Sequence, residues 1–280
     1  MAVTALPAQP STRPAANLRT DRWWIQPLIT FLGFGAFIVY SAWASFWPHD
    51  FLALAPHTNG NRLLSPFYSP CITSHCGPGN LGTSWHLLSW WPYSAALLVV
   101  PFPLMFRGTC YYYRKAYYRS FWLSPPACAV PEPHKRYTGE SRFPLIIQNI
   151  HRYSWYFAIP LPIILGWEAF KSLQFQPVVN GVLANNAHPG WGLSLGSIVL
   201  FVNAFLLASY TASCHSCRHI CGGHLNAFSK GPARYWLWRQ VTKLNSHHMG
   251  LAWISLVFVA LTDLYVRLVA SGTFVDPKLF

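Results

Sequence analysis

Five long apolar segments constrain the fold of this chain more than any other feature. Each is long enough to cross about 30 Å of hydrocarbon, which takes about 20 helical residues. Because backbone polar groups find no water inside a membrane, we expect these segments to be α-helices and expect no strands. The predicted fold is an all-α integral membrane bundle of five transmembrane helices. The spans lie at about 24–46, 85–106, 145–170, 193–210 and 250–268, and the fourth is expected to continue as a helix to about 220.

The composition agrees with a membrane protein. The 280 residues are 52% hydrophobic and only 10% charged, which is too little charge to solvate the surface of a soluble globule. We therefore divide the chain into a polar cytoplasmic tail, 1–22, and a single membrane domain, 23–280. The formal net charge of +13 could indicate a nucleic-acid partner, but multi-pass membrane proteins gather Lys and Arg in their cytoplasmic connections.

The distribution of basic residues predicts the orientation. The tail, the connection 107–152 and the connection 211–249 hold 3, 8 and 5 of the 20 Lys and Arg residues. These parts lie on the same side of a five-span chain, so the N-terminus is predicted to be cytoplasmic and the C-terminus outside. The lipid bilayer thus accounts for the basic charge, and no nucleic-acid partner is expected. Both basic connections could also bind a soluble protein at the cytoplasmic face.

The seven cysteines divide between the two sides of the membrane. Cys71 and Cys76 lie in the first outer connection, where an oxidising compartment favours a local disulfide between them. A metal site that includes His75 is the alternative. The other cysteines fall in the cytoplasmic connections, where disulfides are disfavoured. These are Cys110, Cys128, Cys214, Cys217 and Cys221.

Potential metal ligands are concentrated between Cys214 and His224, where three cysteines and three histidines follow the fourth span. His215 and His219 are four residues apart. If the fourth helix continues through them, both imidazoles lie on one face and can reach a single metal ion, as in HxxxH zinc sites. This histidine pair is the half of a metal site that we predict from this stretch.

Cys110 and Cys128, from the other cytoplasmic connection, could complete a Cys2His2 site with the histidine pair. Zinc takes such a set as a closed tetrahedron, whereas a [2Fe-2S] cluster takes two thiolates on one iron and two imidazoles on the other. Cys214 and His248 are the replacements that we consider for these ligands. The residue types alone do not choose between the two metals.

Haem b is the alternative cofactor. Histidines in separate membrane helices can clamp a haem iron from two sides. The alternative for each such histidine is a purely structural role, a hydrogen bond between helices. The histidines within or at the ends of spans are His86, His151, His247 and His248.

The segment that opens the third span carries side chains suited to a quinone. His151 and Tyr153 can hydrogen-bond quinone carbonyls, and Arg152 can stabilise a reduced, anionic oxygen. Trp155 supplies a flat aromatic wall. The alternative is an aromatic belt with one snorkelling arginine.

Two acidic residues in the outer half of the membrane are candidates for a proton path. Asp263 lies about 21 Å along the last helix at 1.5 Å per residue, and Glu168 lies near the outer end of the third span. Either could instead be an interfacial residue that is paired with Arg267 or Lys171.

Several strings resemble the five-helix membrane anchor, the cytochrome-b-like C subunit, of actinobacterial succinate:menaquinone oxidoreductase, in the succinate dehydrogenase and fumarate reductase family. The better-known five-helix anchors hold two haems through histidines in four helices, and this chain departs from them because its first span contains no histidine. The strings that carry the resemblance are Thr109–Arg119, Ser124–Cys128, Asn149–Tyr153, and Cys214–His219 with Gly222 and Gly223.

The resemblance implies a multi-pass subunit of the bacterial inner (plasma) membrane that binds a flavoprotein subunit and an iron-sulfur subunit, and it allows a further small membrane subunit. The expected function is to pass electrons from succinate to menaquinone, through a [2Fe-2S] centre at the cytoplasmic side. Haem b is the alternative relay. A zinc-dependent membrane enzyme is the alternative from another class, and a secondary transporter is disfavoured because the sequence shows no internal repeat.

Overall fold

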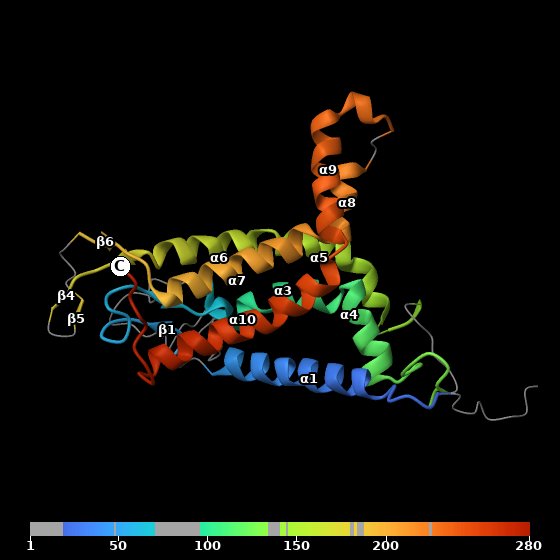
Figure 1. The fold of residues 1–280 in the computed structure, drawn as a ribbon, viewed down its shortest axis with the longest axis horizontal. Helices are drawn as coiled ribbons and strands as arrows, with labels where there is room; N and C mark the ends of the chain where they lie inside the picture. Colours follow the sequence, from blue (N-terminus) through green and yellow to red (C-terminus); the bar gives the residue numbers. More distant parts are fainter. Residues whose placement is uncertain are drawn as a thin grey trace, which may run out of the picture.

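The computed structural model describes residues 19–47, 49–70, 96–133, 141–143, 145–179, 182–183, 188–223 and 226–280. Within these ranges, long helices lie side by side as a bundle (Figure 1). A helical hairpin projects sideways from one end of the bundle, and short strand pairs lie at the other. We call these the hairpin end and the strand end.

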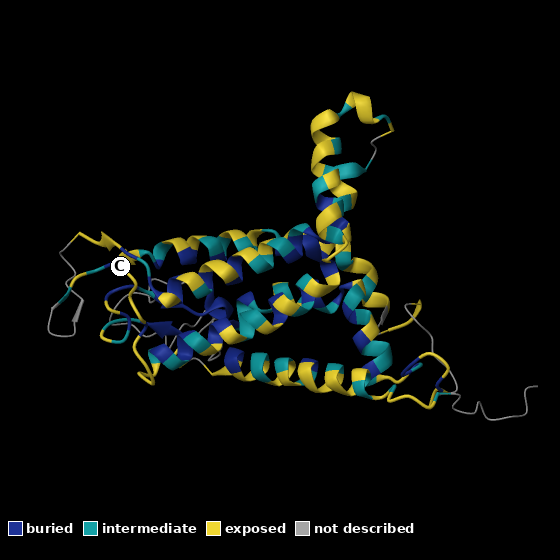
Figure 2. Ribbon diagram, in the orientation of Figure 1, coloured by how far each residue is buried: buried dark blue, intermediate teal, exposed yellow. Residues whose placement is uncertain are grey.

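Among the described residues, three helices are long and apolar enough to cross a membrane, namely α1 (Ile25–Phe46), α7 (Leu195–Ala212) and α10 (His248–Ala270). They agree with the first, fourth and fifth predicted spans. Large apolar side chains are exposed on their outer faces, such as Val39 and Phe205, each 70% exposed. Figure 2 shows these faces beside a buried interior. Extensive apolar exposure of this kind indicates contact with lipid.

The predicted second and third spans are built from shorter helices. The described part of the second consists of α2 (Ala96–Val99) and α3 (Pro101–Gly108). The third consists of the 3₁₀ helix η4 (Leu145–Ile150), α5 (His151–Ala158) and α6 (Pro160–Lys171). The N-terminal residue of α6 is a proline, which lacks an N–H, so the α-helical hydrogen bonding is interrupted between α5 and α6.

At the hairpin end the chain twice leaves the bundle and turns across its axis (Figure 1). After α3 it forms α4 (Tyr111–Ala116) and a π-helical turn, η2 (Tyr117–Phe121). After α7 it forms the hairpin, which consists of α8 (His215–Gly222), the 3₁₀ turn η5 (Phe228–Lys230) and α9 (Pro232–Asn245).

The prediction that the fourth helix continues to about 220 is wrong. α7 ends at Ala212, and the backbone of Cys214 is extended, with φ −62° and ψ 144°, before α8 begins. The Cys214 side chain caps the new helix by accepting the N–H of Ser216 at 3.4 Å. Asn245 closes the base of the hairpin by donating to the carbonyl of Ser213 at 2.8 Å. The helix therefore restarts in a new direction.

The prediction that the chain has no strands is also wrong. In the described part of the chain, three antiparallel pairs of two-residue strands lie at the strand end, outside the long apolar helices, together with a 3₁₀ turn, η1 (Pro66–Tyr68). The requirement for helices applies to backbone in hydrocarbon, so it does not exclude strands there. The pairs are β1 (Leu52–Ala53) with β2 (Leu63–Leu64), β3 (Gln174–Phe175) with β6 (Gly190–Trp191), and β4 (Val178–Val179) with β5 (Val182–Leu183).

The buried carboxylate of Asp276 fastens the strand end. It accepts the N–H of Gly196 at 2.8 Å and the hydroxyl hydrogen of Tyr265 at 2.6 Å. A negative charge is favourable here because Gly196 lies in the first turn of α7. A Cβ atom on Gly196 would lie 2.4 Å from the side chain of Leu63, so a larger residue would have to displace that buried side chain. The C-terminal segment is thereby tied to both α7 and α10.

Candidate redox centre

Two cysteines and two histidines lie together in the core at the hairpin end. The Sγ atom of Cys110 lies 3.7 Å from Nε2 of His248, and the Sγ atom of Cys214 lies 3.2 Å from Nε2 of His151. Cys110, Cys214 and His248 are each only 1% exposed, and both cysteines pack in the same hydrophobic core. We call these four residues the Cys/His group.

Each member of the Cys/His group stands at a helix end. Cys110 and Cys214 have extended backbone immediately before α4 and α8, where the chain leaves α3 and α7. His151 and His248 are the first residues of α5 and α10. α3 and α7 end at this level of the bundle, and α5 and α10 begin here. Four segments that are far apart in the sequence therefore meet at the Cys/His group.

Two hydroxyl groups orient the imidazoles. The Nδ1 atom of His248 lies 2.6 Å from the Ser213 hydroxyl, and Nδ1 of His151 lies 2.9 Å from the Thr109 hydroxyl. Each hydroxyl also donates its own hydrogen to a backbone carbonyl of the preceding turn, at 2.9 and 2.7 Å. The proton between hydroxyl and imidazole therefore belongs to Nδ1, and Nε2 presents its lone pair to the sulfur. Histidines that ligate metals are commonly fixed in this way.

Burial keeps the two thiols neutral in the absence of a metal. It raises the pKa of the Cys110 thiol, and it raises the pKa of the Cys214 thiol to about 11. Each thiol can then donate its hydrogen to the Nε2 atom that faces it. A metal that binds cysteine must displace these protons, because the ligand is the thiolate.

A chain of stacked aromatic rings joins the two imidazoles. Phe106 stacks on His151 with 5.0 Å between ring centroids, and Tyr210 stacks on His248, also at 5.0 Å. The Phe106 and Tyr210 rings contact each other at 5.2 Å. Haem b with two histidine ligands needs an open slot for the porphyrin between the imidazoles. Since aromatic rings pack there, the pair His151 and His248 does not fit haem b. His86, another candidate from the sequence, lies outside the described residues.

A single metal ion is not supported either. Within the described residues, no group of three or more His, Cys, Asp or Glu side chains is placed so that it could hold a metal ion. A [2Fe-2S] cluster distributes four ligands over two iron ions, so its ligands stand further apart than those of one ion. Two thiols and two imidazoles with free Nε2 lone pairs are the donor types that a Rieske-like cluster takes.

The structure does not bring the predicted ligand set together. Of the four predicted residues, only Cys110 lies in the Cys/His group. Cys128 is exposed, with its sulfur 3.6 Å from a guanidinium nitrogen of Arg119. His215 and His219 are exposed on α8 with their Nε2 atoms 3.0 Å apart, and partial burial lowers the pKa of His215. The geometry of this histidine pair follows the predicted spacing, but α8 carries it away from the bundle.

The sequence did contain a signal for the observed group. The sequence offers Cys214 and His248 as replacement ligands, whereas it suits His151 to quinone binding. All four members of the group lie at the predicted inner ends of spans. The spacing of His215 and His219 predicts one helical pair, and α8 forms that pair. The break before α8 directs it away from the bundle.

A buried cation lies beside the Cys/His group. Arg107 is 8% exposed, and its guanidinium donates to the Tyr113 hydroxyl at 2.8 Å, to the Ser255 hydroxyl at 2.9 Å and to the carbonyl of Ala252 at 3.1 Å. It also lies 4.6 Å from the centroid of the Tyr210 ring. None of these partners is an anion, so among the described residues the positive charge is stabilised by neutral hydrogen-bond acceptors and an aromatic ring.

The predicted quinone residues do not line one cavity. His151 belongs to the Cys/His group. Trp155 is buried and donates from Nε1 to the carbonyl of Thr211 at 2.9 Å. Arg152 and Tyr153 point outward, and Tyr153 is 68% exposed. The four side chains therefore face in different directions around the start of α5.

An apolar cavity of about 410 Å³ lies next to the Cys/His group. Thr109, which bonds His151, is part of its wall, together with Tyr117 and Trp122. Gln148 also lines it, and both polar atoms of that amide are buried without a hydrogen-bond partner among the described residues. A second apolar cavity, of about 260 Å³, shares wall residues with the first. No histidine of the described part of the chain lines either cavity.

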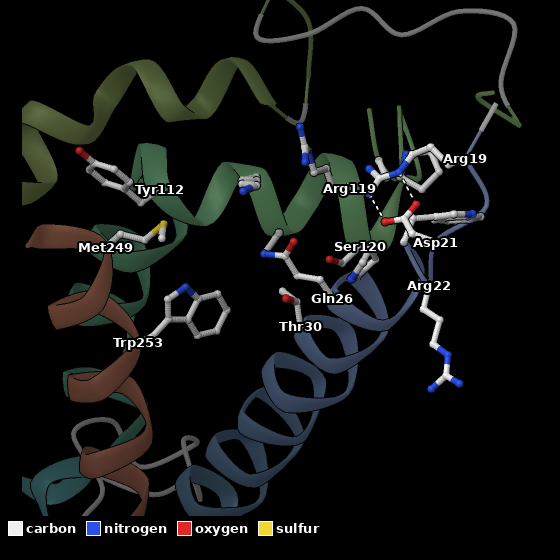
Figure 3. A pocket seen from close by; sticks show the side chains of 16 residues that line it. Arg19, Asp21, Arg22, Gln26, Thr30, Tyr112, Arg119, Ser120, Met249 and Trp253 are labelled. Carbon is white, nitrogen blue, oxygen red and sulfur yellow. Dashed lines mark hydrogen bonds and ion pairs between the residues drawn. The ribbon is translucent and has the colours of Figure 1, made fainter. Parts of the chain in front are cut away.

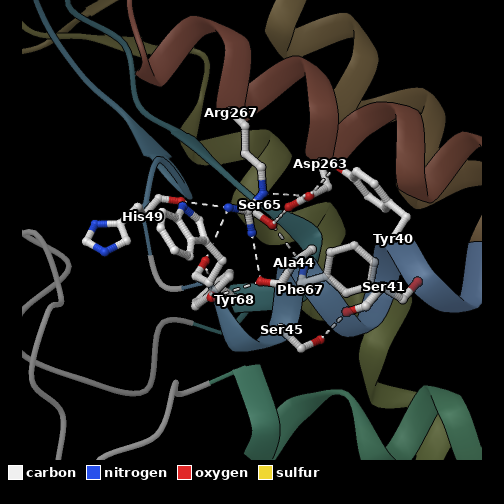
Figure 4. A network of polar contacts seen from close by, with 11 residues as sticks. Tyr40, Ser41, Ala44, Ser45, His49, Ser65, Phe67, Tyr68, Asp263 and Arg267 are labelled. Carbon is white, nitrogen blue, oxygen red and sulfur yellow. Dashed lines mark hydrogen bonds and ion pairs between the residues drawn. The ribbon is translucent and has the colours of Figure 1, made fainter.

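The two predicted proton-path acids are both held in ion pairs. Asp263 accepts from Nε of Arg267 at 2.8 Å, and Glu168 lies 2.9 Å from Nζ of Lys171. Figure 4 shows the first pair within a polar network at the strand end. This pairing is the alternative that the sequence allowed, and a role in proton transfer stays a prediction. The predicted disulfide between Cys71 and Cys76 lies outside the described residues.

Comparison with known proteins identifies the family. The family model described as actinobacterial succinate dehydrogenase subunit SdhC matches residues 25–272. The chain belongs to the SdhC family. A solved structure described as the Mycobacterium smegmatis Sdh1 complex in the apo form contains a chain that is 46% identical, with 98% of each chain covered and a TM-score of 0.80. A search of curated proteins gives no match.

Membership in the SdhC family confirms the resemblance seen in the sequence. The chain is a subunit of succinate dehydrogenase, which is an oxidoreductase complex. Its long apolar helices place it in the bacterial plasma membrane. The match to a chain of the Sdh1 complex supports association with the other subunits of the enzyme.

Proposed function

We propose that this SdhC-family chain is a five-helix anchor that carries electrons from the iron-sulfur subunit to menaquinone through a [2Fe-2S] centre. Its ligands would be Cys110, Cys214, His151 and His248. The observation that carries the proposal is the buried meeting of two thiols with two imidazoles whose Nε2 atoms face the sulfurs. The cluster would supply a one-electron carrier between the partner subunits and the quinone.

The proposed topology has five spans, with the hairpin end in the cytoplasm. Two runs of consecutive short helices lie beside the three long helices (Figure 1). The run α2 and α3 would be the second span, and the run η4, α5 and α6 would be the third. The connections at the hairpin end carry most of the Lys and Arg residues, as the positive-inside rule requires. The flavoprotein and iron-sulfur subunits would bind at this end, so the Cys/His group would lie at the level of the membrane surface that faces them.

The protein would hold the cluster through rigid helix ends. Ser213 and Thr109 fix the imidazole rings by accepting from Nδ1. The surrounding rings and aliphatic side chains exclude water, and a dry site strengthens the effect of nearby charges. Arg107 would then stabilise the reduced centre, because reduction adds negative charge next to a buried cation.

The quinone would bind in the apolar cavity of about 410 Å³ rather than across His151, Arg152, Tyr153 and Trp155. The cavity walls suit an apolar ring, and the Gln148 amide supplies a donor that has no partner of its own. Its distance from the cluster would be short, since Thr109 lies in the cavity wall and bonds His151. His151, from the segment predicted to bind quinone, would thus link the centre to the quinone cavity through Thr109.

The test is electron paramagnetic resonance and iron analysis of the purified complex, with Cys214→Ser compared with Cys128→Ser. Cys214→Ser should abolish a Rieske-like signal and lower the iron content by about two ions per complex. Cys128→Ser should leave both unchanged, since that cysteine is exposed and outside the group. The clusters of the partner subunit serve as an internal standard. A haem Soret band, or an unchanged spectrum in Cys214→Ser, would refute the proposed centre.

A further inference from the structure

A polar pocket of about 270 Å³ opens at the hairpin end, apart from the Cys/His group and from the apolar cavity. It is formed by the N-terminal part of α1 with the residues before it, by α4 and η2, and by the start of α10 (Figure 3). Figure 3 shows the Gln26 and Thr30 side chains on one side and Tyr112, Met249 and Trp253 on the other. The pocket therefore lies between helices, at the level where they leave the bundle.

Positive charge dominates the pocket wall. Among the described residues, its charged side chains are those of Arg19, Arg22, Lys115 and Arg119, together with the one carboxylate of Asp21. That carboxylate is already held by Arg19, whose Nε lies 2.7 Å from it. The Nε atom of Arg119 is buried and has no hydrogen-bond partner. Lys115 is exposed. The pocket thus carries a net positive charge, with donors available for an anionic oxygen.

An apolar stripe continues from the pocket along α10. Met249 and Trp253 line the pocket, and Val257 and Leu261 follow at intervals of four residues on the same helical face. Met249 is 50% exposed, and Val257 and Leu261 are each 53% exposed. Side chains that are both apolar and exposed on a membrane helix face lipid tails. A ligand with an anionic head in the pocket would therefore have a path for apolar chains.

We propose that this pocket binds the phosphate group of an anionic phospholipid in the leaflet at the hairpin end. Basic pockets between membrane helices on the cytoplasmic side suit anionic head groups, because the cations compensate the phosphate charge near hydrocarbon. The aromatic rings of Trp23 and Trp253 in the wall suit the interface between head groups and tails. The proposal uses the membrane topology given above and does not depend on the [2Fe-2S] centre.

Tyr112 connects the lipid pocket to the redox site. It lines the pocket, and its ring lies 5.1 Å from the His248 ring. Met249, the next residue after His248, lines the pocket as well. A lipid bound here would therefore pack against the start of α10, where His248 stands.

The test is native mass spectrometry of the whole complex in nanodiscs that contain phosphatidylglycerol or only phosphatidylcholine. We expect one strongly retained phosphatidylglycerol per chain and no retained phosphatidylcholine. Two cations near an anionic head group each contribute about a factor of five, so Lys115→Gln with Arg119→Gln should weaken retention about 25-fold. The matched control is Arg239→Gln with Lys243→Gln, which removes two exposed cations from α9, outside the pocket, and should leave retention unchanged.

Two further arms distinguish the source of the phosphate and a folding defect. Millimolar inorganic phosphate should not displace the lipid, because it lacks the tails; displacement would show a phosphate site without lipid specificity and overturn the proposal. The proposal would also be overturned if phosphatidylcholine were retained as strongly as phosphatidylglycerol. It would fail as well if the Lys115→Gln single variant and the double variant both retained phosphatidylglycerol fully. The electron paramagnetic resonance spectrum and melting temperature of the variants report on the centre and on folding separately, so failure here does not imply failure of the proposed function.

Discussion

The buried ion pair between Asp263 and Arg267 is expected to be the most sensitive point for stability at the strand end. Asp263 is fully buried and accepts from Arg267, from the Ser65 hydroxyl and from the Tyr40 hydroxyl, the last at 2.6 Å. The guanidinium also donates to the carbonyls of Ala44 at 2.8 Å and of His49 at 2.7 Å (Figure 4). The pair therefore joins α10 to the end of α1 and to the segment after it.

Arg267→Met should lower the free energy of unfolding by about 3–5 kcal/mol, because it leaves a buried carboxylate without its cation. The carbonyls that accept from the guanidinium would lose their donors as well. Asp263→Asn should cost less, about 1–3 kcal/mol, since the amide oxygen can still accept hydrogen bonds and the arginine keeps its carbonyl partners. The double variant should be more stable than the sum of the two losses predicts, by about 0.5–3 kcal/mol.

Unfolding of the purified complex in mixed detergent micelles, followed for the wild type, both single variants and the double variant, measures these differences. The rank order is the central result. If Arg267→Met costs no more than Asp263→Asn, the carboxylate does not need the arginine as its counter-charge. If the losses of the two variants simply add, the two side chains act independently and the reasoning from the ion pair fails.

Three other substitutions probe the hairpin end. Ser213→Ala removes the partner of Nδ1 in His248 and should weaken metal binding about 10–100-fold, seen as lower iron content after chelation; unchanged iron would contradict the orienting role. Gln148→Leu should raise KM for menaquinone about fivefold through loss of one hydrogen bond, with succinate oxidation by an artificial acceptor unchanged; an unchanged KM would place the quinone elsewhere. Gly222→Ala puts a Cβ atom 2.3 Å from Trp238, and the hairpin should become more susceptible to proteolysis at a cost of about 1–3 kcal/mol; equal proteolysis would show that α8 shifts without strain.

Much of the architecture could be predicted because hydrocarbon imposes length and polarity on each span. The predicted spans 24–46 and 250–268 differ from α1 and α10 by no more than two residues at either end. The third span is interrupted before Pro160, where proline lacks the N–H that an α-helix needs. The ion pairs of Asp263 and Glu168 were also accessible, because the partners lie three or four residues away on the same helices.

The membership of the Cys/His group was decided by tertiary structure. The sequence placed all of its members near one side of the membrane, because each lies at the inner end of an apolar segment. It could not say which helix ends are neighbours, since that depends on how side chains of different helices pack. Nor could it show that α7 stops at Ala212. That break turns Cys214 into the core and carries the pair His215 and His219 away from it.

The sequence by itself therefore determined the membrane class, the depth of the ligands and the kinds of donor atom. The tertiary structure decided which donors meet, which space aromatic rings occupy, and which cavity adjoins them. The physical reason is that hydrophobic patterning records how far each residue lies from water. Contacts between residues 138 positions apart, such as Cys110 and His248, are fixed only when the helices pack.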